Sequence, residues 1–481
     1  MVARTLRRPG GRLVSGQDRQ GAPNRQAMPA RRVALDVISA VRESDAYANL
    51  LLPVRISRAA LNEADAGLAT ELTYGTLRMQ GYYDEVIALA ANRPVTQIDG
   101  PVLDVLRLAC HQLLSMRVAQ HAAVDESVEL ARAVGSRSSI GFVNGVLRTI
   151  TRTDAEEWRQ RVLASAGSGE ERLALEYSHP LWVVRAFRQV LVTEGREHEL
   201  EALLAADNVP PRVSLTALPG FATVDELDAK PAEYSPVGAR LGGGDPLKLE
   251  AVRSGRARVQ DEGSQLAALA LSRSRPIAAG ERWLDLCAGP GGKAALLTAE
   301  ALAGGATLVA NELVPARAQL VRNALAVFDP APEVWEFDGT QIGEREQGGF
   351  DRVMIDAPCT GLGALRRRPE ARWRKQPGDV AALGALQAGL LTSGLDALKP
   401  GGILAYVTCS PHAGETKSIV ASVLRKRSDI ELIDTPAVLQ SIVREPLDLA
   451  GGTHAQLWPH RTGTDAMFIQ LMQRAGSTTA G

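Results

Sequence analysis

The sequence predicts a multidomain chain with an N-terminal all-α helical bundle, a small α+β connecting domain and a C-terminal α/β domain. Apolar residues recur at helical spacing up to about residue 150, and a mixed, glycine-rich region follows. From about residue 260, short apolar runs that end in acids alternate with helical stretches. This alternation is typical of a mostly parallel, doubly wound sheet.

The composition bounds the class of protein. The chain has 481 residues, of which 45% are hydrophobic and 23% are charged, as in ordinary globular proteins of several domains. Four cysteines are too few for a disulfide framework, so a reducing, cytoplasmic compartment is expected. No segment approaches about 18 consecutive apolar residues, so no membrane span is expected. Nothing in the sequence demands more than a monomer.

Residues 1–30 are expected to form a disordered basic arm. The first 32 residues hold eight arginines against one acid, Asp18, and almost no large apolar side chains. No apolar core follows the arginines, which excludes a secretory signal. A solubility tail and an RNA-contacting arm are both consistent with this composition. Residues 476–481 are expected to be a short tail.

Residues 31–155 are expected to form the helical domain. The segment RRVALDVISAV places Ala34, Val37 and Val41 on one helical face. The segment PVLDVLRLACHQLL repeats this pattern after a proline suited to a helix start. Cys110 lies on the second apolar stripe, so a buried thiol is expected there.

Residues 156–255 are expected to form the α+β connecting domain. Residues 171–206 have a helical pattern, and the segment NVPPRVSLTAL indicates a turn that leads into a strand. The glycine-rich segment VGARLGGGDPLKL is typical of a loop.

Residues 256–475 are expected to form the α/β domain, and five of its apolar runs end in residues suited to a binding site. These runs end at Asp285, Glu312, Asp338, Asp356 and Thr408–Cys409. Open α/β sheets bind their ligands at the carboxyl ends of the strands. One such acid would be explained as a solvated strand cap, but their recurrence at successive strand ends predicts a common pocket.

The first of these strands runs into a glycine-rich loop, DLCAGPGGKAALL. Gly289, Gly291 and Gly292 allow the backbone to approach a ligand closely before a helix begins. The loop matches neither the dinucleotide-binding glycine pattern nor a Walker phosphate loop, and a tight structural turn would also explain it. Glu312 favours a ligand, because an acid at the next strand end can accept hydrogen bonds from ribose hydroxyls.

Cys359 and Cys409 end two predicted strands that we expect to be adjacent. Small core residues, a metal pair and a redox dithiol are alternative explanations. No His or Cys partners lie at metal-ligand spacing, so no metal site is predicted, and a redox pair is more often Cys-x-x-Cys. The remaining role is that of a nucleophile, for which a thiolate is well suited.

Three motifs together resemble the RNA cytosine-C5 methyltransferases of the Nop/Sun group: DLCAGPGGK, DAPCTGLGALRRRPEARW and VTCSPHAGET. In the helical part, GLATELTYGTLR, LRLACHQLL, HAAVDESVELA and FVNGVLR resemble the NusB-like RNA-binding domain. The resemblance covers roughly residues 30–475 and implies a Rossmann-like class I methyltransferase domain. This layout is that of the bacterial RsmB (Fmu) type, which methylates a cytosine of small-subunit (16S) ribosomal RNA.

The resemblance implies S-adenosylmethionine as the methyl donor. Glu312 would hold its ribose, Asp338 would lie by its adenine, and Asp356 would lie at its methionine end. Glu312 stands where the family usually has Asp, but its longer side chain is still expected to reach the ribose. The loop against the cofactor would consist of Cys287, Ala288, Gly289, Pro290, Gly291, Gly292 and Lys293.

The resemblance assigns Cys409, in the Thr-Cys-Ser motif, as the nucleophile that adds to carbon 6 of cytosine. Cys359 would help remove the carbon-5 proton so that the adduct is released. DNA cytosine methyltransferases use the Pro-Cys thiol as nucleophile, so swapped roles are the main alternative. Asp356 would hydrogen-bond to the base. Lys293 would either lower a thiol pKa or make a phosphate or structural contact.

The basic segment after Cys359 is expected to grip the RNA backbone that leads the target base into the site. A merely solvated loop is the alternative. Such binding would weaken as salt rises, and the base would have to be unstacked or single-stranded to reach the pocket. The arginines expected to bind RNA are Arg366, Arg367, Arg368, Arg372 and Arg374.

Other functions stay open at this point. Transfer RNA is the alternative substrate. A non-catalytic NusB-like RNA-binding or ribosome-assembly factor would not need the thiols and acids, and an enzyme acting on a small molecule would not need the basic segment. Near the C-terminus, Ala466, Met467 and Phe468 replace the family's usual Gly-Phe-Phe, for which we expect a repacked final strand.

Overall fold

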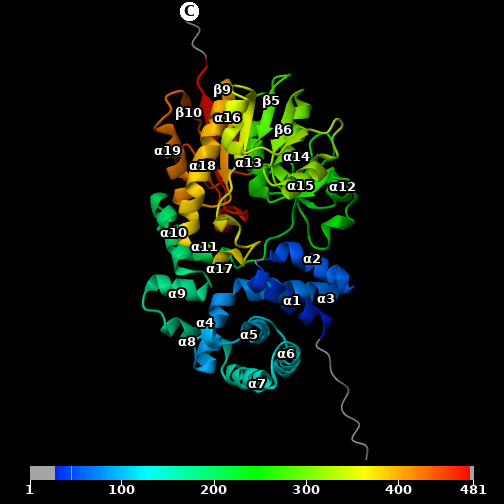
Figure 1. Cartoon of the computed structure of the whole chain (residues 1–481), viewed down its shortest axis with the longest axis vertical. Coiled ribbons are helices and arrows are strands. Elements are labelled where there is room, and N and C mark those ends of the chain that lie inside the picture. The colour runs from blue at the N-terminus through cyan, green and yellow to red at the C-terminus, as the bar shows by residue number, and fades with distance from the viewer. Residues whose placement is uncertain (1–27, 45, 477–481) are drawn as a thin grey trace, which may run out of the picture.

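The structure, a computed structural model, describes residues 28–44 and 46–476. A helical domain lies at one end and an α/β domain at the other, with a smaller helical part beside them (Figure 1). The first helix begins at Pro29, so the predicted arm extends two residues too far. The rest of that arm, apart from Met28, and all but Gly476 of the predicted tail lie outside the described residues.

The N-terminal domain consists of helices whose apolar faces share one core. Val37, Leu72, Val105 and Leu106 are fully buried in it. Cys110 is also fully buried, as its place on the apolar stripe predicts, and burial raises the pKa of its thiol. The helices are α1 (Pro29–Ser44), α2 (Ala48–Arg58), α3 (Glu63–Arg78), α4 (Gln80–Ala91), α5 (Gly100–Leu114), α6 (Gln120–Val134) and α7 (Arg137–Thr151).

The connecting region begins with α8 (Ala155–Ala164) and a helical stretch that the sequence predicts as one piece. That stretch divides into α9 (Gly169–Glu176), α10 (Leu181–Thr193) and α11 (Leu200–Ala206). The break between α9 and α10 contains Ser178, which has a positive φ of 54°, and Pro180, which precedes α10.

A four-stranded antiparallel sheet follows, in the order β2-β3-β1-β4. Its strands are β1 (Ser214–Ala217), β2 (Lys230–Pro231), β3 (Gly238–Arg240) and β4 (Ala257–Val259), with α12 (Glu250–Arg253) before β4. We placed residue 257 in the α/β domain, but β4 pairs with β1 and so extends the connecting sheet. Three residues are too short a pattern to indicate which sheet a strand joins.

The C-terminal domain is built on an eight-stranded sheet in the order β10-β12-β9-β8-β5-β6-β7, with β11 paired to β12. The pairs among β5 to β9 are parallel, and β12 is antiparallel to both β9 and β10. The strands are β5 (Arg282–Asp285), β6 (Thr307–Asn311), β7 (Glu333–Trp335), β8 (Phe350–Asp356), β9 (Leu398–Thr408), β10 (Ile430–Leu432), β11 (Ala455–Gln456) and β12 (Phe468–Arg474).

Helices cover both faces of this sheet because successive strand residues point to opposite sides. Met354 of β8 faces the core shared with α13 and α14, whereas Val353 and Ile355 face the core shared with α18 and α19. The helices are α13 (Glu262–Ser272), α14 (Gly292–Ala303), α15 (Pro315–Leu325), α16 (Ile342–Arg345), α17 (Ala371–Arg374), α18 (Pro377–Ala397), α19 (Lys417–Leu424), α20 (Thr435–Ile442) and α21 (Pro459–Thr462).

One helix of the described residues, α18, is long and apolar enough to count as a membrane-span candidate by length and composition. In the fold it is a core helix, because Leu390, Leu391 and Leu395 pack onto the sheet. The predicted final strand is present as β12, which begins at Phe468. The predicted run that ends at Asp338 is shorter than expected, since β7 ends at Trp335 and Asp338 caps a following 3-10 helix.

Candidate active site

The carboxyl ends of the central parallel strands bring the predicted site residues to one edge of the sheet. Asp285 ends β5, and Asp356 ends β8. Glu312 and Cys409 directly follow β6 and β9. Because β5 lies between β6 and β8, and β9 lies next to β8, these side chains come from neighbouring strands.

The two thiols that end adjacent strands lie against each other. The Sγ atoms of Cys359 and Cys409 are 3.4 Å apart, within hydrogen-bonding distance for sulfur. A hydrogen bond donated by Cys359 lowers the pKa of Cys409 and raises that of Cys359 well above its ordinary value. The positive charges of Lys293 and Arg368 lower the pKa of Cys409 further. The geometry therefore favours a thiolate at Cys409 and a thiol at Cys359.

A buried carboxylate, Glu415, joins the two loops that carry the thiols. Glu415 is fully buried and accepts hydrogen bonds from the backbone N–H of Thr360, 2.7 Å away, and from the Thr360 hydroxyl. It also accepts a 2.6 Å bond from the Ser410 hydroxyl. The residues after Cys359 and Cys409 are thus tied to one anion. Glu415 was not among the predicted site residues, although it lies in the motif VTCSPHAGET.

Gly363 closes the Cys359 loop against the strand that carries Cys409. Its N–H donates to the Cys409 carbonyl and its own carbonyl accepts from the Ala466 N–H, both at 2.8 Å. A Cβ at this position would lie 2.1 Å from the Ala466 carbonyl oxygen, so only glycine fits. Ala466, one of the residues that replace the family's usual Gly-Phe-Phe, makes this contact with Gly363 directly before the final strand.

Lys293 and Asp356 form an ion pair beside the thiols. The Lys293 Nζ lies 2.9 Å from the Asp356 Oδ2. Burial acts to lower the pKa of Lys293, but the Asp356 carboxylate outweighs it, so the net shift is upward. Lys293 stays a cation at neutral pH.

Asp285 is a buried carboxylate that its neighbours compensate poorly. The side chain is fully buried, and neither carboxylate oxygen has a hydrogen-bond partner of normal geometry among the described residues, although the nearby Cys287 N–H acts to lower its pKa. Burial and the nearby Asp356 raise the pKa of Asp285 to about 7, against the opposing effect of Lys293. Buried polar atoms are nearly always paired in folded proteins, so these oxygens mark a place for a cationic or hydrogen-donating ligand group.

The glycine-rich loop begins two residues after Asp285. Gly291 has a φ of 104°, which favours glycine, and a Cβ there would lie 2.5 Å from the Ala324 Cβ. The Gly289 N–H donates to the Glu312 Oε2 at 3.2 Å, and Arg317 lies 3.2 Å from the same oxygen. The loop is therefore held next to Glu312.

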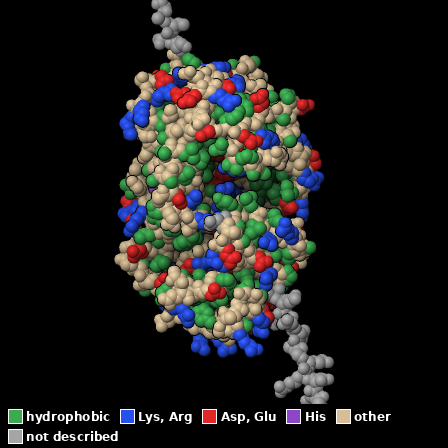
Figure 2. Space-filling view, in the orientation of Figure 1, with side chains coloured by type: hydrophobic (Ala, Val, Ile, Leu, Met, Phe, Trp, Pro, Cys, Tyr) green, Lys and Arg blue, Asp and Glu red, His purple; other side chains and the backbone are tan. Residues whose placement is uncertain are grey.

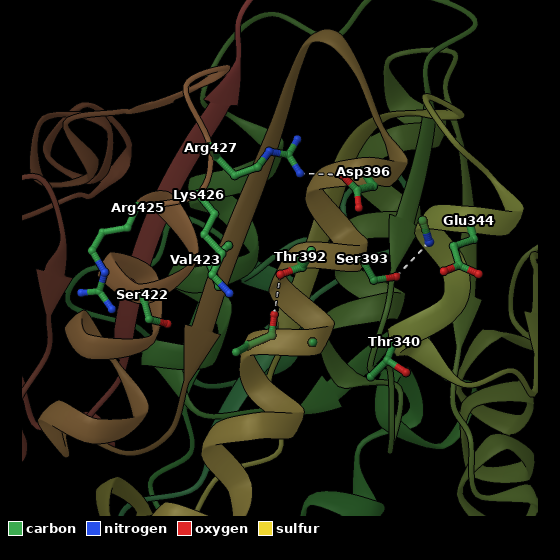
Figure 3. A pocket seen from close by; sticks show the side chains of 13 residues that line it. Thr340, Glu344, Thr392, Ser393, Asp396, Ser422, Val423, Arg425, Lys426 and Arg427 are labelled. Atoms are coloured by element: carbon green, nitrogen blue, oxygen red, sulfur yellow. Dashed lines mark hydrogen bonds and ion pairs between the residues drawn. The ribbon is translucent and has the colours of Figure 1, made fainter.

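Asp338 lies further along this edge. It is exposed, and its Oδ1 accepts from the Thr340 N–H at 2.9 Å. Together with Phe337 it lines a cavity of about 360 Å³. A second cavity, of about 470 Å³, opens between α16, α18 and the end of α19 (Figure 3), and its 13 lining residues include none of the predicted site residues. Within the described part of the chain, no group of three or more His, Cys, Asp or Glu residues has metal-binding geometry.

Two of the arginines expected to grip RNA are structural instead. Arg372 is fully buried, and burial lowers its pKa to about 9. Arg374 donates to the carbonyls of Val41 and Ala46 in the N-terminal domain. The groups that accept from Arg372 are the carbonyls of Arg78, Tyr177, Ser178 and Asp207 and the side chain of Asn208. Arg372 thus joins all three domains and has no free donor face for RNA.

Arg366 and Arg367 are engaged near the final strand. Arg366 is 5% exposed and donates to the Gly463 carbonyl, and Arg367 pairs with both Asp261 and Asp465. Arg368 differs, because it is exposed, contacts the Tyr47 ring and acts through its charge on Cys409 and Glu370. Arg368 is therefore the arginine of this predicted set that keeps its charge available to a ligand.

The fold and this site together define a methyltransferase of the α/β class whose α/β domain follows an N-terminal helical domain. A family model for the 16S rRNA methyltransferase RsmB/F matches residues 276–473, and one for the NusB family matches residues 28–152. A Mycobacterium tuberculosis protein named "Putative methyltransferase" is 46% identical over 95% of this chain and 99% of its own length.

Ribosomal RNA small subunit methyltransferase B of Pseudomonas putida is 30% identical, over 88% of this chain and 96% of that protein. The crystal structure of PH0851 superposes with a TM-score of 0.77 at 20% identity, over 94% of this chain and 99% of that one, which shows a shared fold. The chain belongs to the RsmB/F family of RNA methyltransferases.

Proposed function

We propose that this chain forms 5-methylcytosine in RNA through a covalent adduct of Cys409, and that its substrate is small-subunit (16S) ribosomal RNA. The observation that carries the proposal is the pair of thiols 3.4 Å apart at the ends of adjacent strands. Carbon 5 of cytosine is a poor nucleophile, and addition of a thiolate to carbon 6 converts the ring into an enamine. The relative named ribosomal RNA small subunit methyltransferase B supports the choice of RNA.

The residues at the strand ends fit S-adenosylmethionine. This cofactor supplies an electrophilic methyl group when bound. The unpartnered oxygens of Asp285 and the neighbouring Asp356 suit its ammonium group, and the glycine-rich loop allows close approach. Glu312 would hold the ribose, and Asp338 would lie by the adenine in the adjoining cavity. The other loop residues, from Cys287 to Lys293, would form its wall.

The two thiols have different roles in the reaction of the base. Cys409, whose pKa is lowered by the neighbouring thiol, adds to carbon 6 and makes carbon 5 nucleophilic. Once Cys409 is bonded to carbon 6, the Cys359 thiol no longer donates to a thiolate and can lose its own proton to solvent. After methylation, the Cys359 thiolate accepts the carbon-5 proton, the bond between carbon 6 and Cys409 breaks, and its electron pair returns to Cys409 as the restored thiolate. Asp356 hydrogen-bonds to the base, while Lys293 lies beside it and favours the thiolate of Cys409.

A covalent trap tests this proposal. The Cys359→Ala variant is mixed with S-adenosylmethionine and 16S rRNA and run on a denaturing gel. We expect a slow, ribonuclease-sensitive band that disappears when Cys409 is also changed to Ala. Full methylation by the Cys409→Ala variant would overturn the role assignment and support the swapped one. No methylation of 16S rRNA by the unchanged protein would point to another RNA, and transfer RNA is the first to test.

A further inference from the structure

Tyr47 is an exposed aromatic side chain whose ring contacts two arginines of the segment that follows Cys359. The residue is 49% exposed and lies directly before α2. The Arg368 and Arg374 guanidinium carbons lie 5.8 Å and 5.4 Å from the centre of its ring. These distances are in the range of cation–π contacts, so a tyrosine ring from the N-terminal domain meets charges from the catalytic domain.

The backbone around Tyr47 is fixed by bonds between the two domains. The Ala48 N–H, the first of α2, donates to the Glu370 Oε1 at 3.2 Å, and Arg374 donates to the Ala46 carbonyl. The Tyr47 side chain makes no capping hydrogen bond to the helix. The ring is thus held in position by its neighbours and is left half open to solvent.

An exposed apolar stripe of α2 continues from Tyr47. Leu50 is 66% exposed and Val54 is 43% exposed, at helical spacing from Tyr47, and exposed Arg58 follows on the same face. The helix contains two arginines and no acid, so this face suits an anionic partner with apolar surfaces. Figure 1 shows α2 on the side of the helical domain that faces the α/β domain, and Figure 2 shows a hollow between these two parts.

Arg368 connects this stripe with the proposed catalytic thiols, because it contacts Tyr47 and its charge acts on Cys409. Arg368 lies nine residues after Cys359, is exposed, and is one of the positive charges that act on Cys409. A strand that leaves the proposed catalytic pocket past Arg368 would therefore pass the exposed ring of Tyr47.

We infer that Tyr47 and Arg368 form a stacking site for a nucleobase of the single-stranded RNA that flanks the target cytosine. The inference rests on the proposed function and names a contact that the N-terminal domain makes to that substrate. Aromatic rings and guanidinium planes stack on any base, and a basic helix face follows the phosphates. An apolar peptide would not use the two guanidinium groups beside the ring, which favours RNA over a protein partner.

Binding and cross-linking of a short single-stranded fragment of 16S rRNA test this inference. The fragment carries 5-iodouridine beside the cytosine at which the covalent trap of Cys359→Ala forms. Loss of one base stack should weaken binding by Tyr47→Ala about 5- to 100-fold, whereas Tyr47→Phe should bind like the unchanged protein. Tyr47→Leu keeps an apolar side chain without a π face and should weaken binding similarly. Leu89→Ala removes a side chain that is 43% exposed elsewhere in the same domain and is the matched control. Thermal unfolding checks that each variant is folded.

Ultraviolet light should cross-link the iodinated RNA to the peptide that contains Tyr47. Equal affinity of Tyr47→Ala and unchanged protein, or a cross-link only elsewhere, would overturn the stacking site and leave the α2 face to a protein partner. Methyl transfer from labelled S-adenosylmethionine is measured in parallel. If methylation persists while the stacking results fail, only this inference falls. If the Tyr47 cross-link forms without any methylation, the proposed function falls instead.

Discussion

The Sγ atoms of Cys359 and Cys409 lie 3.4 Å apart although 50 residues separate them in the chain. Each follows one of two adjacent parallel strands, and Glu415 holds the residues beside both. Two thiols at this distance cannot both ionise easily, so one is favoured as thiolate and the other as its proton donor. The assignment of different chemical roles follows from this asymmetry.

The pKa of Cys409 should depend on its neighbour. In the unchanged protein, alkylation of Cys409 by iodoacetamide should show a midpoint below that of an ordinary thiol, because the neighbouring thiol lowers the pKa of Cys409. Cys359→Ala removes the hydrogen bond that favours the thiolate, so the midpoint should move upward. Cys359→Ser retains a donor and should keep it low. Mass spectrometry of the alkylated peptides measures each site, and buried Cys110 should stay unmodified. The same midpoint in Cys359→Ala and unchanged protein would contradict the prediction.

Ionisation of the buried Asp285 carboxyl should lower the free energy of unfolding at alkaline pH. Its pKa in the folded protein, about 7, lies above the ordinary value of 3.8, so folding favours the protonated form. The free energy of unfolding should therefore fall as pH rises from about 4 to about 7 and stay low above that range. Asp285→Asn removes this penalty, which is on the order of a few kcal/mol. Its thermal unfolding temperature should exceed that of the unchanged protein at pH 8.5 by more than at pH 5.5.

The same variant should bind S-adenosylmethionine more weakly, because an amide cannot pair with its ammonium group. Calorimetric titration at pH 8.5 measures this. A difference in unfolding temperature that does not change with pH would show that Asp285 is not the titrating group.

Glu415→Gln should reduce methyl transfer without loss of cofactor binding. Hydrogen bonds to a charged group contribute about 1.5–3 kcal/mol each, and the amide cannot accept from all the groups that now donate to the carboxylate. The loops that carry Cys359 and Cys409 would then shift, so we expect kcat to fall at least about tenfold, since one such bond exceeds 1.4 kcal/mol. Glu431→Gln, at an exposed site on β10, is the control. An unchanged kcat would mean that Glu415 does not position the thiols.

The arginines after Cys359 should separate into two groups by their effect on RNA binding. Arg368→Ala should reduce the slope of log K against log salt concentration by about 0.7–0.9, the effect of one lost phosphate contact. Arg372→Met should leave that slope unchanged but lower the unfolding temperature, because five acceptors in two other domains lose their donor. Fluorescence anisotropy at several salt concentrations measures both slopes. A reduced slope for Arg372→Met would contradict its structural role.

Much of the site could be predicted from short segments of the chain. The acids Asp285 and Asp356 end apolar runs, and parallel strands place their carboxyl ends at one edge of a sheet, so the convergence follows from the strand pattern alone. The apolar stripe that carries Cys110 likewise indicates burial by its spacing. These features depend on local periodicity, which the amino-acid sequence by itself determines.

The tertiary structure alone decided which charged groups are free. Arg372 and Arg368 stand four residues apart in one basic segment. Arg372 is enclosed by residues far away in the chain, among them Arg78, which is 294 positions away, and Ser178, which is 194 positions away. Arg368 instead contacts the Tyr47 ring and is exposed to solvent. Membership of β4 in the connecting sheet and the role of Glu415 were also not predictable. Burial of a charge depends on partners that only the packed domains bring together, and no local spacing encodes contacts over such distances along the chain.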